Sequence, residues 1–219
     1  MLVSNGELTG SAREIVAMAR DAGVVVQFVD RARLDALAQN HQGMAAYASA
    51  AEYGTVEGIL EKAAQKGEDA FVVVLDGITD PHNLGAIIRS AECMGAHGVI
   101  VPERRSAGLN PAAVKAAAGA LAYLSVARVT NLSQTLDLFK EKGLWILGAD
   151  ADGTPAGETD LTGAVALVIG AEGEGLSPLV KRHCDKLVGL PMYGHIGSLN
   201  ASVAAGMLLG EIAKARHHA

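Results

Sequence analysis

The chain has 219 residues, of which 50% are hydrophobic and 4% aromatic, and its formal net charge at pH 7 is −6. This length accommodates one large domain or one domain with a smaller companion, and the hydrophobic content is sufficient for a sizeable core. The acidic balance argues against a protein that holds nucleic acid by bulk electrostatic attraction, but leaves room for a local basic patch formed by residues 102–106 (PERRS) with Arg89, Lys115 and Arg128.

The first 69 residues predict short helices and strands ahead of one longer helix. Ser11 and Glu14 form a capping box for a helix over 11–22, whose residues Ile15, Met18 and Ala19 share one face. A strand at 24–29, a helix at 31–38, a strand at 43–49 and a helix at 56–66 follow. We place a first domain at 1–50, a linker with a helix at 51–69 and a second domain at 70–219.

Residues 70–219 show a regular alternation of strands and helices. The predicted strands lie at 71–76, 97–102, 124–129, 144–150, 164–172 and 186–192. The predicted helices lie at 83–95, 111–120, 131–143, 178–183 and 198–216. Alternation of this kind predicts an α/β fold with a mostly parallel sheet that helices cover on both faces.

Three glycine-rich loops follow strands of this predicted sheet. They are GITDPHNLGAIIRSAE at 77–92, AEGEGLS at 171–177 and PMYGHIGSLNAS at 191–202. Ligands of parallel sheets bind at the carboxyl ends of the strands, so we expect the three loops to meet at one site. The second loop lacks the Lys-Ser/Thr of a Walker loop and the GxGxxG pattern. Its acidic residues Glu172 and Glu174 favour a positively charged ligand or one held by neutral backbone groups.

Three segments of the chain resemble the three motifs of the SpoU (TrmH) family of RNA ribose 2′-O-methyltransferases, in family order and spacing. They are DPHNLGAIIRSAECMGAHGVIVP at 80–102, LVIGAEGEGLS at 167–177 and LPMYGHIGSLNASVAAG at 190–206. The resemblance extends over residues 70–215 and is closest to the branch that methylates a guanosine ribose in 23S rRNA. It implies a SPOUT-type fold with a C-terminal deep trefoil knot, S-adenosylmethionine (SAM) as cofactor with S-adenosylhomocysteine as product, and a homodimer that completes each site.

The N-terminal part resembles the end of a small ribosomal-protein-like (L30e-like) RNA-binding domain, through RLDALAQNHQGMAAY at 33–47. A full domain of that kind would begin a few tens of residues earlier, so we expect a partial domain that lacks its first strand and helix.

The family resemblance also implies the site residues. The implied active site consists of Asn83, Arg89, Glu172, Ser198 and Asn200. The implied cofactor contacts are Gly148, Ile169, Gly170, Leu190, Met192 and Leu199. A guanidinium is almost never neutral in a protein, so we expect Arg89 to act as a cation, oriented by Glu172, rather than as a base. It would bind RNA phosphate and stabilise the developing 2′-alkoxide.

Several of these residues also have purely structural interpretations. Asn83 fits a helix N-cap and Arg89 a solvated surface arginine. Ser198 is a natural N-cap for the last helix, which would place Asn200 in the first turn, facing the strand ends. Arg89 and Asn83 would lean toward a common pocket only if their helix began after Asn83.

Two kinds of alternative function remain open at this point. The same chemistry on tRNA, or on rRNA to confer antibiotic resistance, is one alternative, and a catalytically idle RNA-binding or ribosome-assembly module is another.

Cys93 and Cys184 lie far apart, so we expect two free thiols in a reducing cytoplasm. No apolar run approaches the about 18 residues of a membrane span, and MLVSNGELTG is no signal peptide. The histidines have no metal-ligand spacing, and no metal is predicted. We expect His82 and His195, which adjoin the site, to be candidates for RNA contact.

Overall fold

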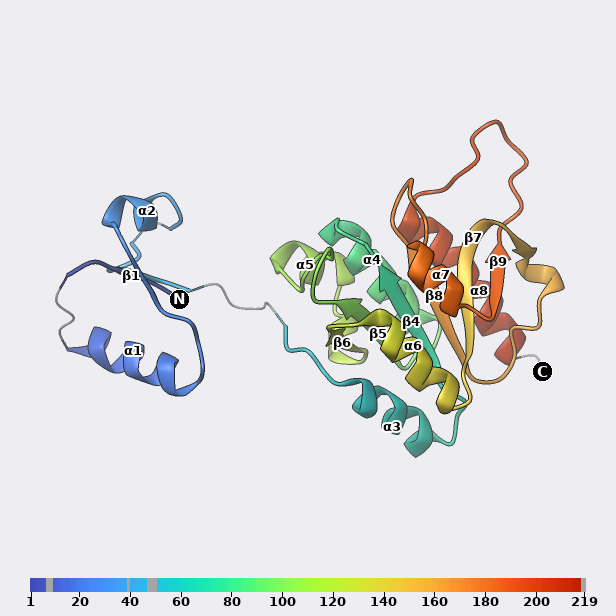
Figure 1. The fold of residues 1–219 in the computed structure, drawn as a ribbon, viewed down its shortest axis with the longest axis horizontal. Coiled ribbons are helices and arrows are strands. Elements are labelled where there is room, and N and C mark those ends of the chain that lie inside the picture. The colour runs from blue at the N-terminus through green and yellow to red at the C-terminus, as the bar shows by residue number, and fades with distance from the viewer. Residues whose placement is uncertain (7–9, 39, 47–50, 218–219) are drawn as a thin grey trace. The chain divides into compact units, whose positions relative to one another are not determined.

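The computed structural model describes residues 1–6, 10–38, 40–46 and 51–217. The chain divides into two compact units, Met1–Ser49 and Ala50–Ala219. Figure 1 labels their helices and strands. Within the described ranges, no helix combines the length and the apolar character that crossing a membrane requires.

The N-terminal unit is built around a three-stranded sheet in the order β2-β1-β3. Its elements are β1 (Leu2–Ser4), α1 (Ser11–Asp21), β2 (Gln27–Val29), α2 (Arg31–Asp35) and β3 (Met44–Ala45). β1 pairs parallel with β2 and antiparallel with β3. The central strand β1 was not predicted, and part of the predicted strand 43–49 (residues 47–49) lies outside the described residues. Among the described residues of this unit, Leu2, Val29 and Leu34 form a small hydrophobic cluster.

The predicted capping box of α1 is wrong, and the apolar face that Ile15, Met18 and Ala19 share is not the buried one. Gly10 is the N-cap, with a φ of 53°, and no side chain caps the helix. Val16 is the buried residue, whereas Ile15 and Met18 are 43% and 70% exposed. Three-residue spacing in the sequence identified an amphipathic helix but not which face the neighbouring strands cover.

The C-terminal unit contains a six-stranded sheet in the order β6-β5-β4-β8-β7-β9. The strands are β4 (Phe71–Asp76), β5 (Gly98–Pro102), β6 (Ser125–Val129), β7 (Trp145–Pro155), β8 (Val165–Gly170) and β9 (Lys186–Gly189). Every neighbouring pair is parallel, which confirms the predicted sheet. β7 runs beyond its predicted end at residue 150 and bulges between Ala149 and Thr154 against β9.

Helices cover both faces of this sheet, as predicted. They are α3 (Val56–Lys66), α4 (Pro81–Cys93), α5 (Pro111–Ala117), α6 (Leu132–Glu141), α7 (Pro178–His183) and α8 (Ala201–His217). Two 3-10 turns, Ala120–Ala122 and Ala156–Glu158, were not predicted. The threading of the C-terminal segment through a knot stays a prediction.

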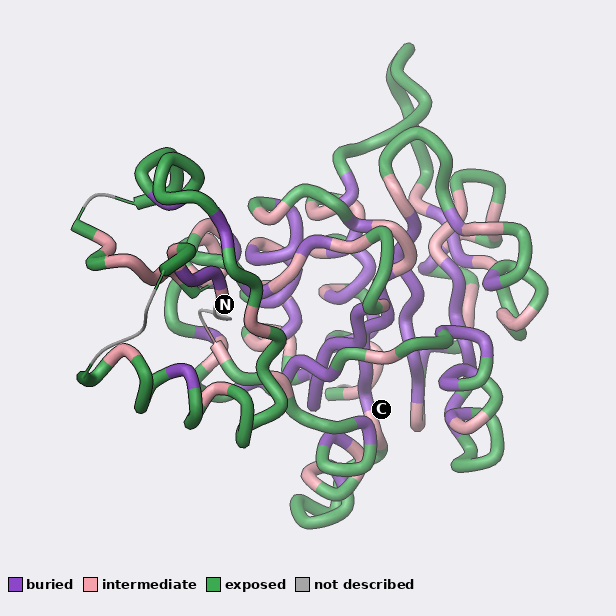
Figure 2. The backbone as a smooth tube through the Cα atoms, turned by 60° about the vertical axis from the view of Figure 1, so that its left-hand side comes forward, coloured by how far each residue is buried: buried purple, intermediate pink, exposed green. Residues whose placement is uncertain are grey.

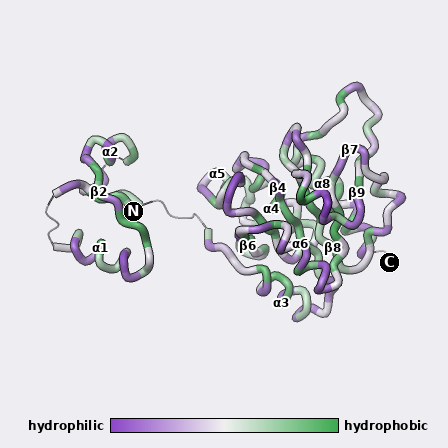
Figure 3. Tube along the Cα trace, in the orientation of Figure 1, coloured by the Kyte–Doolittle hydropathy of each residue, from purple (hydrophilic) through white to green (hydrophobic). Residues whose placement is uncertain are grey.

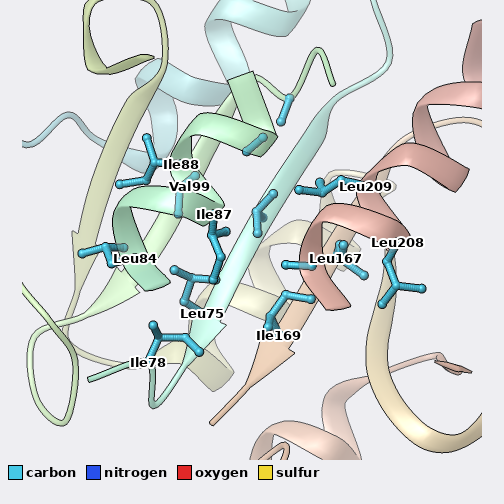
Figure 4. Close-up of a cluster of buried hydrophobic side chains, with 14 of the residues drawn as sticks. Leu75, Ile78, Leu84, Ile87, Ile88, Val99, Leu167, Ile169, Leu208 and Leu209 are labelled. Atoms are coloured by element: carbon cyan, nitrogen blue, oxygen red, sulfur yellow. The ribbon is translucent and has the colours of Figure 1, made fainter. Parts of the chain in front are cut away.

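Side-chain alternation along the central strands creates two hydrophobic cores. In β4, Phe71, Val73 and Leu75 pack on the side of α4, α5 and α8, and Val72 and Val74 pack on the side of α3 and α6. Figure 4 shows Leu75 and Leu167 between α4 and α8. Figure 2 shows the buried segments running through the middle of this unit, and Figure 3 shows the hydrophobic residues there. A double-sided core explains why these strands read as continuous apolar runs.

His97 is a fully buried polar residue just before β5. Its Nδ1 accepts a hydrogen bond from the Phe71 backbone N–H at 3.0 Å, and its Nε2 lies 3.1 Å from Glu68 Oε2. Because Nδ1 acts as an acceptor, the ring is neutral with its proton on Nε2. Burial lowers the pKa of His97, and this effect outweighs the opposing influence of Glu68.

The lowered pKa of His97 makes stability depend on pH. The unfolded chain binds more protons than the fold at mildly acidic pH, so the free energy of unfolding should fall as the pH drops below about 6.5. His97→Asn keeps an acceptor but does not titrate. Urea unfolding between about pH 8 and about pH 5 should therefore show a shallower pH dependence for this variant. His195→Asn, at an exposed position, should keep the wild-type slope. Equal slopes for wild type and His97→Asn would contradict the expectation.

Candidate active site

Three side chains from three separate segments, the first turn of α4, the turn after β8 and the start of α8, meet beside the carboxyl ends of β4 and β8. Asn83 Nδ2 donates to Glu172 Oε1 at 3.2 Å, and Asn200 Nδ2 donates to Asn83 Oδ1 at 3.0 Å. Asn200 Nδ2 also donates to Glu172 Oε1. The structure thus joins one residue from each of the three predicted loops in a closed hydrogen-bonded cluster, which we call the amide–carboxylate cluster.

The start of α4 fixes Asn83. Asp80 is the N-cap, and its Oδ1 accepts from the His82 N–H at 3.0 Å, with Pro81 as the first helical residue. The alternative of Asn83 as N-cap is therefore wrong. Asn83 is the third residue of the helix, and its side chain is buried with 8% exposure. A buried amide needs partners, and Glu172 and Asn200 supply them.

A tight turn after β8 presents Glu172. Gly170 has no room for a side chain, because a Cβ there would lie 2.2 Å from the carbonyl carbon of Gly175. Ala171 and Gly175 exchange two backbone hydrogen bonds of 3.0 and 2.9 Å across the turn. Gly173 has a φ of 78° at its apex. The glycines of this loop close the turn and aim Glu172 toward Asn83.

Asn200 is the N-cap of α8. Its Oδ1 accepts from the backbone N–H groups of Ser202 and Val203 at 3.0 and 3.3 Å, and from the Ser202 hydroxyl at 2.6 Å. The prediction that Ser198 caps the helix and Asn200 lies in its first turn is wrong. The Ala201 N–H, at the same helix end, donates to Glu172 Oε1 at 3.3 Å. This backbone donor could not be predicted from the sequence, because only the true cap position reveals it.

The other two predicted active-site residues lie outside the cluster. Arg89 is exposed on α4, and neither an ion pair nor a hydrogen bond joins it to Glu172 or to any other described residue. α4 begins before Asn83, and six residues of helix turn Arg89 to a different side from Asn83. Ser198 is exposed in the loop between β9 and α8.

The six predicted cofactor contacts lie in or directly after three adjacent strands and in the connection that follows the last of them. Gly148 lies in β7, Ile169 and Gly170 end β8, and Leu190 directly follows β9. A Cβ at Gly148 would meet the Cys184 Sγ at 2.7 Å, so this glycine has a packing role of its own. Met192 and Leu199, each 37% exposed, lie in the connection between β9 and α8. Residues 191–200 of that connection are all exposed and project from the sheet (Figures 1 and 2).

Neither a metal site nor a disulfide belongs to this constellation. Cys93 and Cys184 are both free, as predicted. Burial raises the pKa of the Cys184 thiol to about 11, so it is an inert core group. Across the described parts of the chain, no group of three or more histidine, cysteine, aspartate or glutamate side chains is arranged to hold a metal ion.

Comparisons with known proteins agree with the motifs and the fold. Residues 70–210 match the SpoU rRNA Methylase family, and residues 1–54 match the model for RNA 2′-O ribose methyltransferase substrate binding. The Bacillus subtilis protein YacO, named for TrmH family tRNA/rRNA methyltransferases, is 42% identical over 98% of this chain and 87% of its own length. A Staphylococcus aureus relative of the same family name is 41% identical over 99% of this chain and 88% of its own length.

Solved structures give the same answer. The SpoU methyltransferase AviRb from Streptomyces viridochromogenes, in complex with AdoMet, superposes with a TM-score of 0.69 and 28% identity, over 100% of this chain and 83% of its own. The A. aeolicus TrmH/SpoU tRNA modifying enzyme has a TM-score of 0.60 and 30% identity, over 68% of this chain and 76% of its own. The resemblance read from the three motifs is confirmed, and the chain belongs to the SpoU rRNA methylase family.

Proposed function

We propose that this chain transfers a methyl group from SAM to a ribose 2′-hydroxyl of RNA, with a guanosine of 23S rRNA as the substrate. The amide–carboxylate cluster carries the proposal, because it joins the three family motifs at the carboxyl ends of adjacent strands. The family membership and the AdoMet complex of AviRb support the cofactor. The match of residues 1–54 to a substrate-binding model supports RNA as the partner of the N-terminal unit.

The residues near the ends of β7, β8 and β9 suit SAM. Met192 and Leu199 offer apolar surface for the adenine, and the backbone groups of residues 191–199 form no hydrogen bonds with the backbone of described residues. Glu172 places a carboxylate beside this region, which suits a positively charged sulfonium. When bound, SAM supplies an activated methyl group that leaves on nucleophilic attack.

The cluster's contribution is positioning. Glu172 Oε1 accepts from both amide side chains and from the Ala201 N–H, so one carboxylate oxygen fixes the positions of all three donors. A ribose hydroxyl is a poor nucleophile at neutral pH and must be held in line with the bond that breaks. Correct orientation supplies about 7–11 kcal/mol in favourable reactions. In this proposal Asn83 and Asn200 hold the reacting groups, and Glu172 holds Asn83 and Asn200.

Arg89 is proposed as the cation that binds RNA phosphate and stabilises the developing 2′-alkoxide. It lies on the exposed side of α4, and α4 packs against α8. Exposed apolar side chains of α8, Val203 (49%) and Met207 (51%), favour a covering partner. We propose that a second copy of the chain covers this surface, so that each Arg89 serves the dimeric enzyme.

The oligomeric state provides a direct check. Light scattering should give about twice the 22.5 kDa mass of one chain. Met207→Asp should shift the mass toward that of the monomer, because it would bury a charge without a partner. Leu37→Asp, at an apolar position in the N-terminal unit that is 45% exposed, serves as the control. A monomeric wild type would contradict the proposed dimer.

The activity itself is tested with tritiated-methyl SAM, unmodified 23S rRNA, bulk tRNA and an Asn200→Ala variant. Label in 23S rRNA, lost in the variant, would support the full proposal. Label in tRNA alone would support the chemistry and overturn the rRNA substrate. Intact SAM binding by calorimetry with no label in either RNA would overturn the proposed activity and favour an RNA-binding or assembly role.

A further inference from the structure

A cleft of about 1230 Å³ adjoins the amide–carboxylate cluster, and none of residues 191–199 lines it. It lies at the carboxyl ends of β4, β5, β6 and β8, and Asn83 and Glu172 form part of its wall. Three arginines line it: Arg104 and Arg105 follow β5, and Arg182 belongs to α7. We call it the arginine cleft.

The three guanidinium groups make no contact that would give them a structural role in the described part of the chain. All three side chains are exposed, and none forms an ion pair or hydrogen bond with a described residue. Four carboxylates line the same cleft, and three of them are held in place by neutral donors. Asp76 accepts from the Ser177 N–H at 2.7 Å, Asp80 caps α4, and Glu172 belongs to the amide–carboxylate cluster. No described residue holds the three guanidinium groups in this way, so they are free to turn toward a ligand.

The amino end of α6 opens onto the same cleft. Asn131 caps the helix, its Oδ1 accepting from the Gln134 N–H at 3.2 Å, and residues 130–133 line the cavity. Ser133 is 9% exposed and lines the cleft, and its hydroxyl makes no hydrogen bond with a described residue. The amino end of a helix, the Ser133 hydroxyl and three guanidinium groups can all donate hydrogen bonds to an anion bound in the cleft.

Arg128 holds the loop that carries Arg104 and Arg105. Arg128 Nη2 donates to the Glu103 carbonyl at 2.9 Å, and the Arg128 guanidinium stacks over the Tyr53 ring at 5.6 Å. Arg128, one of the residues predicted to form a basic patch, thus supports this loop and does not line the cleft. Arg89 and Lys115 do not line the cleft either, whereas Arg182, distant in sequence, does.

We propose that the arginine cleft binds the phosphates of the RNA strand next to the methylated nucleotide. The inference rests on the proposed function, because RNA is the polyanion that such an enzyme must place beside Asn83 and Glu172. Arginine pairs with phosphate through two parallel hydrogen bonds, and phosphate contacts fix the register of a nucleic acid on its protein.

The test compares two triple variants that remove the same charge. Arg104→Gln/Arg105→Gln/Arg182→Gln empties the cleft of guanidinium groups. Lys66→Gln/Lys142→Gln/Lys214→Gln is the control, at exposed positions near the carboxyl ends of α3, α6 and α8. Filter binding of unmodified 23S rRNA is measured over a salt series, with SAM binding followed by calorimetry.

We expect the arginine variant to bind RNA at least about tenfold more weakly. The slope of log K against log salt should become shallower by about 2, from three lost phosphate contacts at about 0.7 each. The lysine variant should keep more of the affinity and slope, and both should bind SAM like wild type. Equal RNA binding by the two variants, or lost SAM binding in the arginine variant, would overturn the proposal.

Methyl transfer separates this inference from the proposed function. If wild type binds RNA through the cleft but transfers no methyl group, the cleft stands as a phosphate site and the proposed activity fails. If wild type methylates 23S rRNA and the arginine variant does so with the same KM, the activity stands and the cleft proposal fails.

Discussion

Replacing Glu172 with alanine is expected to reduce methyl transfer by about 100-fold at saturating SAM and RNA. The change removes the Oε1 atom that accepts from Asn83, Asn200 and the Ala201 N–H. Asn83 is buried, and leaving a buried donor without its partner costs about 1–3 kcal/mol. The two amides would then reorient, and a displacement of about 1 Å at a reacting group costs about 100-fold in rate.

Two further variants make this prediction specific. Glu174→Ala removes the same charge from the same loop, where no described residue bonds to the side chain, and should stay near the wild-type rate. Glu172→Gln keeps an acceptor oxygen without the charge and should fall between the two. Single-turnover transfer gives the rates, and thermal melting reports folding. A Glu172→Ala enzyme with near-normal turnover would show that the cluster is a structural feature of α8 and not part of the active site.

Replacing Gly85 with alanine is expected to destabilise the C-terminal unit by about 1–3 kcal/mol, because it overpacks the contact between α4 and α5. A Cβ at Gly85 would lie 2.4 Å from the Ala113 carbonyl oxygen and 2.5 Å from the Ala116 Cβ. Both neighbours belong to α5, a helix that is held by the Asn110 cap and cannot yield like a flexible side chain. In a helix that packs loosely, the same change would be favourable through helix propensity.

Thermal melting measures this effect, at about 2–4 °C per kcal/mol for a chain of this size. Gly157→Ala is the matched control, because a Cβ there meets nothing within 4 Å and the position is exposed. It should melt within about one degree of wild type. Because α4 carries Asn83, Gly85→Ala should also lower transfer. A Gly85→Ala protein as stable as wild type would mean that the two helices separate at little cost.

The sequence was most informative in residues 70–219, where long apolar strands alternate with capped helices. Every strand and helix predicted there exists, because burial on both faces leaves a strong pattern. In the first 49 residues the strands have two or three residues each, and the hydrophobic cluster of the described part has three buried members, so the pattern was weak. β1, only three residues long, gave no periodic signal.

The site shows the same division between local and long-range information. Loop order after parallel strands predicted that the loops holding Asn83, Glu172 and Asn200 meet. Cap preference could not choose between Ser198 and Asn200, since serine and asparagine are almost equally good N-caps. The choice was made by contacts with Asn83 and Glu172, far away in sequence. Arg182 joined the arginine cleft for the same reason, through packing that local sequence does not encode.

The Asn200 side chain performs two tasks with its two ends. Its oxygen caps the amino end of α8, and its nitrogen donates to Asn83 and Glu172 in the cluster. Residues 191–199 lead directly into this N-cap, so a ligand that binds them should reduce fraying at the start of α8. The free energy of suppressing that fraying is then part of the ligand's affinity. Amide exchange at Ser202 and Val203 should slow when the cofactor binds, which makes the first turn of the last helix a reporter of occupancy.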